Sequence, residues 1–166
     1  MYGGIALGGL ASRTRKITIT APTGAEQDSG WDLPTAGFVS DILVNVRTAE
    51  ATGATKTLDI GLLSSESGGD ADGFVDGLSV SSVGLKRFAP AVTAGGTESY
   101  ISSWTRGVFM TVGLPLAGAN VVGDVGTYYE KPHMIDAVTA RSISYTSGSA
   151  FTELVADIYI VFTEVL

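Results

Sequence analysis

Glycine is spread along the whole chain, and this limits how much of the chain can be helical. The 166 residues include 22 glycines, and a glycine inside a helix costs about 1 kcal/mol relative to alanine. Few windows could therefore hold three helical turns. One short helix at most is expected, over Asp72–Ser79, where Phe74 and Leu78 are spaced four residues apart and an aspartate precedes them.

Alternation of apolar and polar residues with a period of two predicts strands instead. It recurs in four runs, which are Lys16–Thr20, Ser40–Arg47, Thr57–Leu62 and Val108–Leu114. Two further β-rich runs, Ala137–Thr146 and Thr152–Thr163, are separated by a short segment that is typical of a hairpin connection. Short strands separated by turns predict an all-β fold, an antiparallel β-sandwich with jelly-roll-like topology.

The last predicted strand is apolar on both faces. Ala156, Ile158, Ile160 and Phe162 form the face that should point inward, while Val155, Tyr159 and Val161 flank Asp157 on the other face. A strand with two apolar faces is normally covered on both. It should therefore lie in the centre of a sheet or in a contact between subunits.

The first sixteen residues differ from the rest in charge and in glycine content. They carry three cations, no acid and four glycines, whereas the whole chain has a net charge of −7. We expect residues 1–16 to be an extended basic arm and residues 17–166 to be a single β-sandwich domain. The predicted partner-binding residues combine the arm with the outer side of the last strand: Tyr2, Ile5, Leu7, Leu10, Arg13, Arg15, Lys16, Val155, Tyr159 and Val161.

Composition narrows the class of partner. A chain this acidic is a poor candidate for binding nucleic acid, which requires neutralised phosphates. Only 16% of the residues are charged, against about one quarter in an ordinary soluble domain. No uncharged stretch reaches the roughly 20 apolar residues of a membrane-spanning helix. Apolar surface covered by a protein partner, including other copies of the chain, is the better explanation of the missing charge.

Catalytic and metal-binding signals are weak. Asp70, Asp72 and Asp76, with Glu66, could offer oxygen ligands to calcium, but the twelve-residue calcium-loop pattern is absent and an acidic surface loop is favoured. The single histidine, His133, has no nucleophile motif to accompany it and is expected at a strand edge or an interface. We therefore expect neither an enzyme nor a bound cofactor or metal.

Aromatic residues in or beside predicted loops leave two possibilities. The aromatic rings could form a platform on which sugars stack, or they could anchor the protein at an interface with another protein. The interface is favoured here. The residues concerned are Trp31, Tyr100, Trp104, Tyr128 and Tyr129.

Two parts of the chain contain phrases that bear on its family. Between Phe38 and Leu85 they are VSDI, AEATG, KTLDIG and GDADGF, and near the C-terminus they are ARSISYT and ADIYI. Together these phrases resemble those of small structural proteins of tailed bacteriophages, of the head decoration or cement type. The resemblance implies a non-enzymatic virion protein on the capsid surface, which binds the major capsid protein, bridges capsid subunits and associates with itself, with a homotrimer favoured. The alternative is a carbohydrate-binding or adhesin-type sandwich of a virion fibre or cell surface, with a sugar-cleaving enzyme third.

Overall fold

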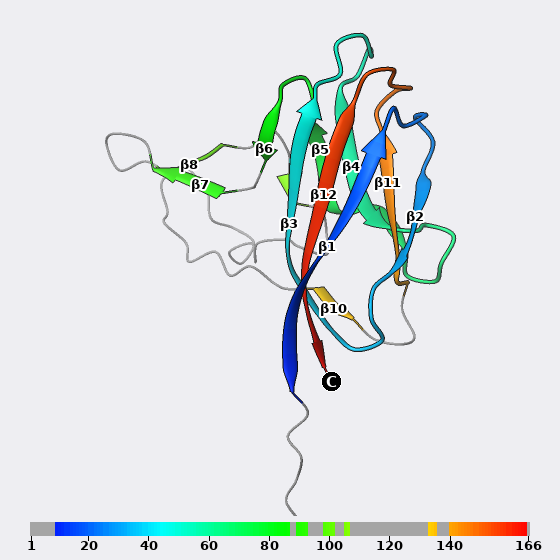
Figure 1. Cartoon of the computed structure of the whole chain (residues 1–166), viewed down its shortest axis with the longest axis vertical. Coiled ribbons are helices and arrows are strands. Elements are labelled where there is room, and N and C mark those ends of the chain that lie inside the picture. Colours follow the sequence, from blue (N-terminus) through cyan, green and yellow to red (C-terminus); the bar gives the residue numbers. More distant parts are fainter. Residues whose placement is uncertain are drawn as a thin grey trace, which may run out of the picture.

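The structure is a computed structural model that describes residues 9–86, 89–92, 98–101, 105–106, 133–135 and 140–165. These residues form strands and loops without any helix, and two antiparallel sheets pack against each other (Figure 1). The prediction of an all-β sandwich is confirmed. A search of the same residues finds no helix long and apolar enough to cross a membrane.

The front sheet, which is nearer the viewer in Figure 1, contains both the first and the last described strands. Its strand order is β1-β12-β3-β10, and β6 also pairs with β3. The bounds are β1 (Leu10–Thr20), β3 (Gly37–Thr48), β6 (Gly84–Lys86), β10 (His133–Ile135) and β12 (Val155–Val165). The prediction that the last strand is central is confirmed, because β12 lies between β1 and β3.

The back sheet has the order β2-β11-β4-β5-β9. Its strands are β2 (Gln27–Asp32), β4 (Thr57–Leu62), β5 (Asp70–Ser79), β9 (Thr105–Arg106) and β11 (Ser142–Ser147). A separate antiparallel pair is formed by β7 (Ala89–Val92) and β8 (Glu98–Ile101).

The core lies between the two sheets and follows the period-two patterns of the sequence. Alternate side chains of β3, β4 and β12 are buried, as are Ile17 and Ile19 of β1. The inward residues predicted for the last strand are all buried: Ala156, Ile158, Ile160 and Phe162. Burial of these apolar side chains supplies the main driving force for packing one sheet on the other.

The short helix expected over Asp72–Ser79 is wrong, because these residues belong to β5 and pair with β4. The pairing of β5 with β4 is irregular between Val75 and Leu78, so the alternation of side chains along β5 is interrupted between Phe74 and Leu78. Both side chains are fully buried in the core. Gly77 has a φ of +70°, a conformation that is outside the helical range.

The hairpin predicted between the last two runs is also wrong. Strand β11 lies in the back sheet and β12 in the front sheet, so residues 148–154 cross from one sheet to the other. Phe151 is buried in this connection, and its backbone N–H donates to the carbonyl of Pro22, 2.9 Å away. The connection therefore closes one end of the core.

The boundary expected at residue 16 falls inside a strand. Residues from Leu10 to Lys16 pair with β12 in an unbroken antiparallel register, although none of their side chains is buried. The first part of β1 therefore belongs to the sheet without contributing to the core. The run predicted over Val108–Leu114 lies outside the described residues, and so does the chain between β9 and β10, so jelly-roll topology stays a prediction.

Candidate interaction surface

The outer face of the front sheet carries the apolar side chains that the sequence assigned to a partner. On β12, Val155, Tyr159 and Val161 are half-buried and alternate with the buried inward residues. Tyr159 lies opposite Leu43 of β3, which is also half-buried. Because β12 is the central strand, these side chains form the middle of a sheet face rather than an edge.

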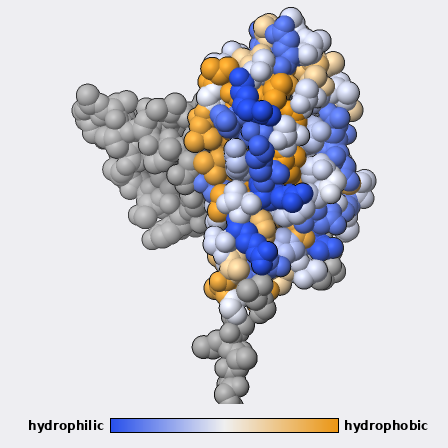
Figure 2. Space-filling view, viewed as in Figure 1, coloured by the Kyte–Doolittle hydropathy of each residue, from blue (hydrophilic) through white to orange (hydrophobic). Residues whose placement is uncertain are grey.

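More exposed apolar side chains lie around the half-buried residues of β12. Exposed fractions are 68% for Leu10, 62% for Leu85, 66% for Met134 and 51% for Val165. Register places Leu10 opposite Val165, and Met134 opposite Phe38. Figure 2 shows hydrophobic patches on this face beside a vertical hydrophilic stripe. We call this set of side chains on the outer side of the front sheet the front face.

Asp157 lies on the outer side of β12, between Val155 and Tyr159 in the alternation of the strand, and it is almost fully buried although it points away from the core. Its carboxylate accepts a hydrogen bond from the Thr18 hydroxyl at 2.7 Å. The Lys16 ammonium lies 3.3 Å from Oδ2 and Nε of Arg47 lies 3.2 Å from the same oxygen. The hydrogen bond from Thr18 lowers the pKa of Asp157, desolvation raises it, and the two cations lower it further. The net result is a pKa below the usual value.

The other two cations of the predicted arm also have partners within the chain. Nε of Arg13 lies 3.2 Å from a carboxylate oxygen of Glu164. The Arg15 guanidinium lies 5.6 Å from the centroid of the Trp31 ring, within the range of a cation–π contact. Arg13 and Arg15 share the side of β1 that carries the buried Ile17 and Ile19, so their contacts lie on the inner side of the front sheet. Lys16, by contrast, lies on the front face, where it shares Asp157 with Arg47.

The aromatic residues proposed for sugar stacking are only partly placed by the structure. Trp31 packs against Phe162 with ring centroids 5.4 Å apart, and Arg15 lies over its ring. Its ring is thus used within the fold and does not form an open platform. Tyr100 is placed by its backbone alone, in β8 opposite Pro90. The other residues of this prediction lie outside the described part of the chain, as do three residues of the predicted arm: Trp104, Tyr128, Tyr129, Tyr2, Ile5 and Leu7.

The acidic segment of the sequence is divided between a loop and β5. Glu66, in the loop, accepts hydrogen bonds from the backbone N–H groups of Arg141 at 2.7 Å and Ser142 at 3.1 Å. These bonds lower the pKa of Glu66 and commit its carboxylate to the fold. Asp70 shares a hydrogen bond with Asp72, which raises the pKa of Asp70. Within the part of the chain that the structure describes, no three ligating side chains gather into a possible metal site.

Glu50 is a structural acid that the sequence patterns did not single out. It is 1% exposed, and one of its carboxylate oxygens accepts bonds from the Thr52 hydroxyl and from the N–H groups of Thr52 and Gly53. The other accepts from the N–H groups of residues 152, 153 and 154. These bonds, the Thr52 hydroxyl first among them, lower the pKa of Glu50 to about 2. Glu50 thereby ties the β3–β4 loop to the connection that leads into β12.

His133 lies on β10, at the edge of the front sheet, which confirms the expected strand-edge position. Its ring meets the Phe74 ring edge-on, with centroids 5.4 Å apart. This contact fixes the histidine against a core side chain.

Comparison with known proteins adds little to the structure. No protein-family model matches the chain, and no curated protein matches it either. A solved chain from the "Cyanophage Pam1 capsid asymmetric unit" is similar to it, with a TM-score of 0.45 and 13% sequence identity. That alignment covers 98% of this chain and 90% of the solved one. At this score and identity the likeness carries no argument about function.

Proposed function

We propose that the protein is a structural component of a phage virion that binds the outside of the capsid and bridges neighbouring capsid subunits through its front face. The observation that carries this proposal is the front face itself, with exposed Leu10, Leu85 and Met134 around a half-buried apolar row. Contiguous apolar surface on a folded protein commonly marks an interaction site. The sequence resemblance to head decoration proteins supplies the identity of the partner.

The charge arrangement supports the same use of the front face. Burying an unpaired charge in an interface is costly, whereas a charge that is already paired and hydrogen-bonded costs less. On this face Lys16 and Arg47 both meet Asp157. A partner could therefore cover this face without having to supply a counter-ion for each charged group.

Binding to purified expanded capsids tests the proposal, with co-sedimentation as the measurement. Leu85→Lys and Met134→Lys alter side chains that are mostly exposed, so the fold should tolerate both substitutions. Each should weaken capsid binding at least about tenfold, which corresponds to about 1.4 kcal/mol. Ala150→Lys is the matched control, because Ala150 is exposed in the connection outside the front face, and it should bind like the parent.

Two outcomes would count against the proposal. Equal binding by all three variants would remove the front face as the contact, and glycan-array binding without capsid binding would favour the carbohydrate-binding alternative. Self-association is a separate expectation, in which the preference for a trimer rests on the resemblance alone. Native mass spectrometry measures it, and a monomer at micromolar concentration would contradict it.

A further inference from the structure

Strand β1 has an open edge. Within the part of the chain that the structure describes, β1 pairs only with β12, and it forms the end of the front sheet (Figure 1). It is eleven residues long, its register with β12 is unbroken, and the side chains of residues 12–16 are exposed. A long, regular strand with one unpaired edge presents a row of backbone donors and acceptors with which a further strand can pair.

The hydrogen-bond pattern shows which residues face that edge. In an antiparallel pair, opposite residues alternate between those that exchange both backbone hydrogen bonds and those that exchange none. The N–H of Ala21 donates to the carbonyl of Leu154 at 2.9 Å, and these two residues continue the unbroken register of β1 with β12. Odd-numbered residues of β1 therefore bond to β12, and even-numbered residues such as Thr14 and Thr18 turn their N–H and C=O groups toward the open edge.

The end strand of the back sheet, β2, is protected against such pairing. Its register with β11 shifts around Gly30, which has a φ of +70°. The N–H of Gly30 donates to Oδ1 of Asp28 at 2.8 Å, and the N–H of Trp31 donates to the Ser29 hydroxyl at 3.3 Å. A bulge whose amides are bonded locally is a common device against the addition of another strand. The register of β1 contains no such irregularity, so β1 is the edge at which a strand can be added.

We propose that β1 of a second copy occupies this edge, paired antiparallel with the first about a twofold axis. In the register that fits best, Thr14 would lie opposite Thr20 of the second copy, and Lys16 opposite Thr18. All of these are even-numbered residues, so the backbone groups that face the open edge in both copies form the hydrogen-bonded pairs. Threonine favours strands, and threonines opposite each other on neighbouring strands stabilise the pairing.

Charge is compatible with this register. Like charges directly opposite each other destabilise a pair of strands, but here Lys16 and Arg15 would lie opposite Thr18 and Ile19 of the second copy. The Thr18 hydroxyl is bonded to Asp157, so each Lys16 would come next to a residue that the other copy's acid holds. Lys16 also meets Asp157 within its own copy. The register therefore brings no two cations opposite each other and moves a cation toward an acid.

The pairing would place the two front faces on the same side of the dimer. The even-numbered side chains of β1 point outward, since Ile17 and Ile19 are buried in the core, and residues opposite each other in a sheet share a face. Two copies would thus form one continuous outer surface, as a dimer and not as the trimer that the resemblance implies. The inference rests on the geometry of β1 and holds whether or not the protein binds a capsid.

Proline at a position that faces the edge tests the pairing. Thr14→Pro removes an N–H that faces the open edge and leaves the bonds to β12 in place, and an edge strand tolerates proline in this orientation. By native mass spectrometry at micromolar concentration the parent should be a dimer, and Thr14→Pro should be a monomer that still melts cooperatively. Thr14→Val is the matched control, because it keeps the N–H at the same exposed position, and it should stay a dimer.

Amide hydrogen exchange on the unaltered protein gives a second measurement that needs no variant. The amides of Thr14 and Thr18 should exchange about tenfold or more slowly at a concentration where the dimer forms than at high dilution. The amides of Arg15 and Ile17 already bond to β12, so their exchange should depend much less on concentration.

Each result decides the matter. A parent that is a monomer or a trimer, or a Thr14→Pro variant that remains dimeric, would overturn the proposal. If the proline variant does not fold, the exchange measurement decides, and exchange at Thr14 and Thr18 that is independent of concentration would overturn it. Concentration-dependent protection at Asp28 and Asp32 would place β2 of the second copy on the edge, which would overturn the pairing of β1 with β1.

Discussion

Replacement of Asp157 by asparagine should destabilise the protein, because a buried acid holds two cations on the front face. The asparagine oxygen can still accept the Thr18 hydrogen bond, but the amide nitrogen would face Lys16 Nζ and Arg47 Nε, which are both donors. The two cations are about half exposed and can regain water, so the cost should fall below that of a fully buried ion pair. We expect a loss of about 2 kcal/mol. For a chain of this length that lowers Tm by about 4–8 °C in a thermal melt followed by circular dichroism.

The pH dependence of the same variant provides a stricter test. The pKa of Asp157 is lower in the folded state than its unfolded value of about 3.8. The carboxylate therefore stabilises the protein at a pH above 3.8. This contribution is lost as the pH falls through the lower pKa of the folded state. The difference in Tm between parent and variant should therefore be full at pH 7 and shrink below about pH 4. Asp72→Asn is the matched control, since Asp72 is exposed beside Asp70 and its removal should leave Tm equal or higher. An Asp157→Asn protein that melts like the parent at pH 7 would refute the role given to this carboxylate.

Two other acids give predictions that can be checked in the same melts. Glu50→Gln places an amide nitrogen among three N–H donors, so Tm should fall by about 5 °C or more at pH 7. Since the folded pKa is about 2, the difference in Tm should persist to pH 4.5 and decrease only below it. A variant as stable as the parent would contradict the structural role of the Glu50 carboxylate. Removal of calcium by a chelator should leave Tm unchanged, because Glu66 is committed to backbone donors. A rise of several degrees on adding calcium would show that the acidic segment binds it after all.

The sequence could predict the strands because burial in a sandwich alternates along each of them. Ile17 and Ile19 in β1, and the inward residues of β12, follow the period of two closely. The period of two fails at β5, because irregular pairing with β4 interrupts the alternation of its side chains between Val75 and Leu78. It also cannot say whether two neighbouring runs share a sheet. The chain between β11 and β12 crosses the sandwich, and Glu50, about a hundred residues earlier, binds it.

The front face could be predicted only in part, for a related reason. An aspartate inside an apolar strand signals that Asp157 needs a partner, but the register with β1 and β3 decides which cations supply it. The basic residues of the first segment illustrate the same limit. Their charge was visible in the sequence and placed them among the predicted partner-binding residues, whereas Arg13, Arg15 and Lys16 each meet a group of this chain. Long-range pairing of this kind leaves no local signal.

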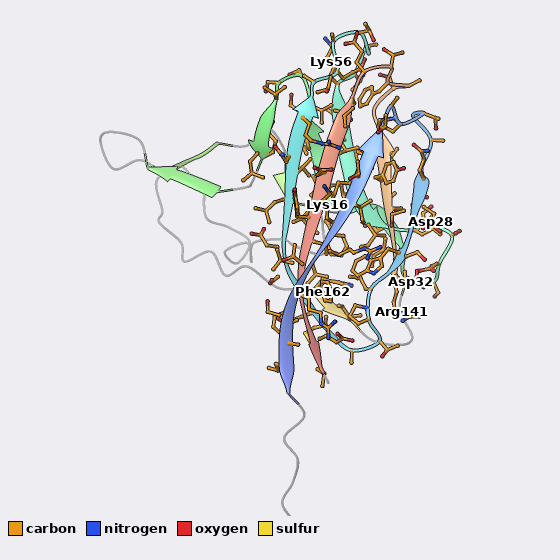
Figure 3. All side chains as sticks on the ribbon, viewed as in Figure 1. Lys16, Asp28, Asp32, Lys56, Arg141 and Phe162 are labelled. Atoms are coloured by element: carbon orange, nitrogen blue, oxygen red, sulfur yellow. The ribbon has the colours of Figure 1, made fainter. Side chains whose placement is uncertain are left out.

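The distribution of charge over the two sheets gives the proposed attachment a direction. The three ion pairs between described residues all lie on strands of the front sheet, whereas the outer side of the back sheet carries several acids close to one another. Desolvation raises the pKa of Asp59, and the nearby charges of Asp76 and Asp72 raise it further. Asp28 and Asp32 lie exposed on β2 (Figure 3). Copies packed through the acidic back sheet would repel each other, so the front face is the side on which close packing costs least. We therefore expect carboxylate labelling at Asp72 and Asp76 to be unchanged on binding to capsids, while amine labelling of Lys16 falls; protection of the aspartates instead would reverse the orientation.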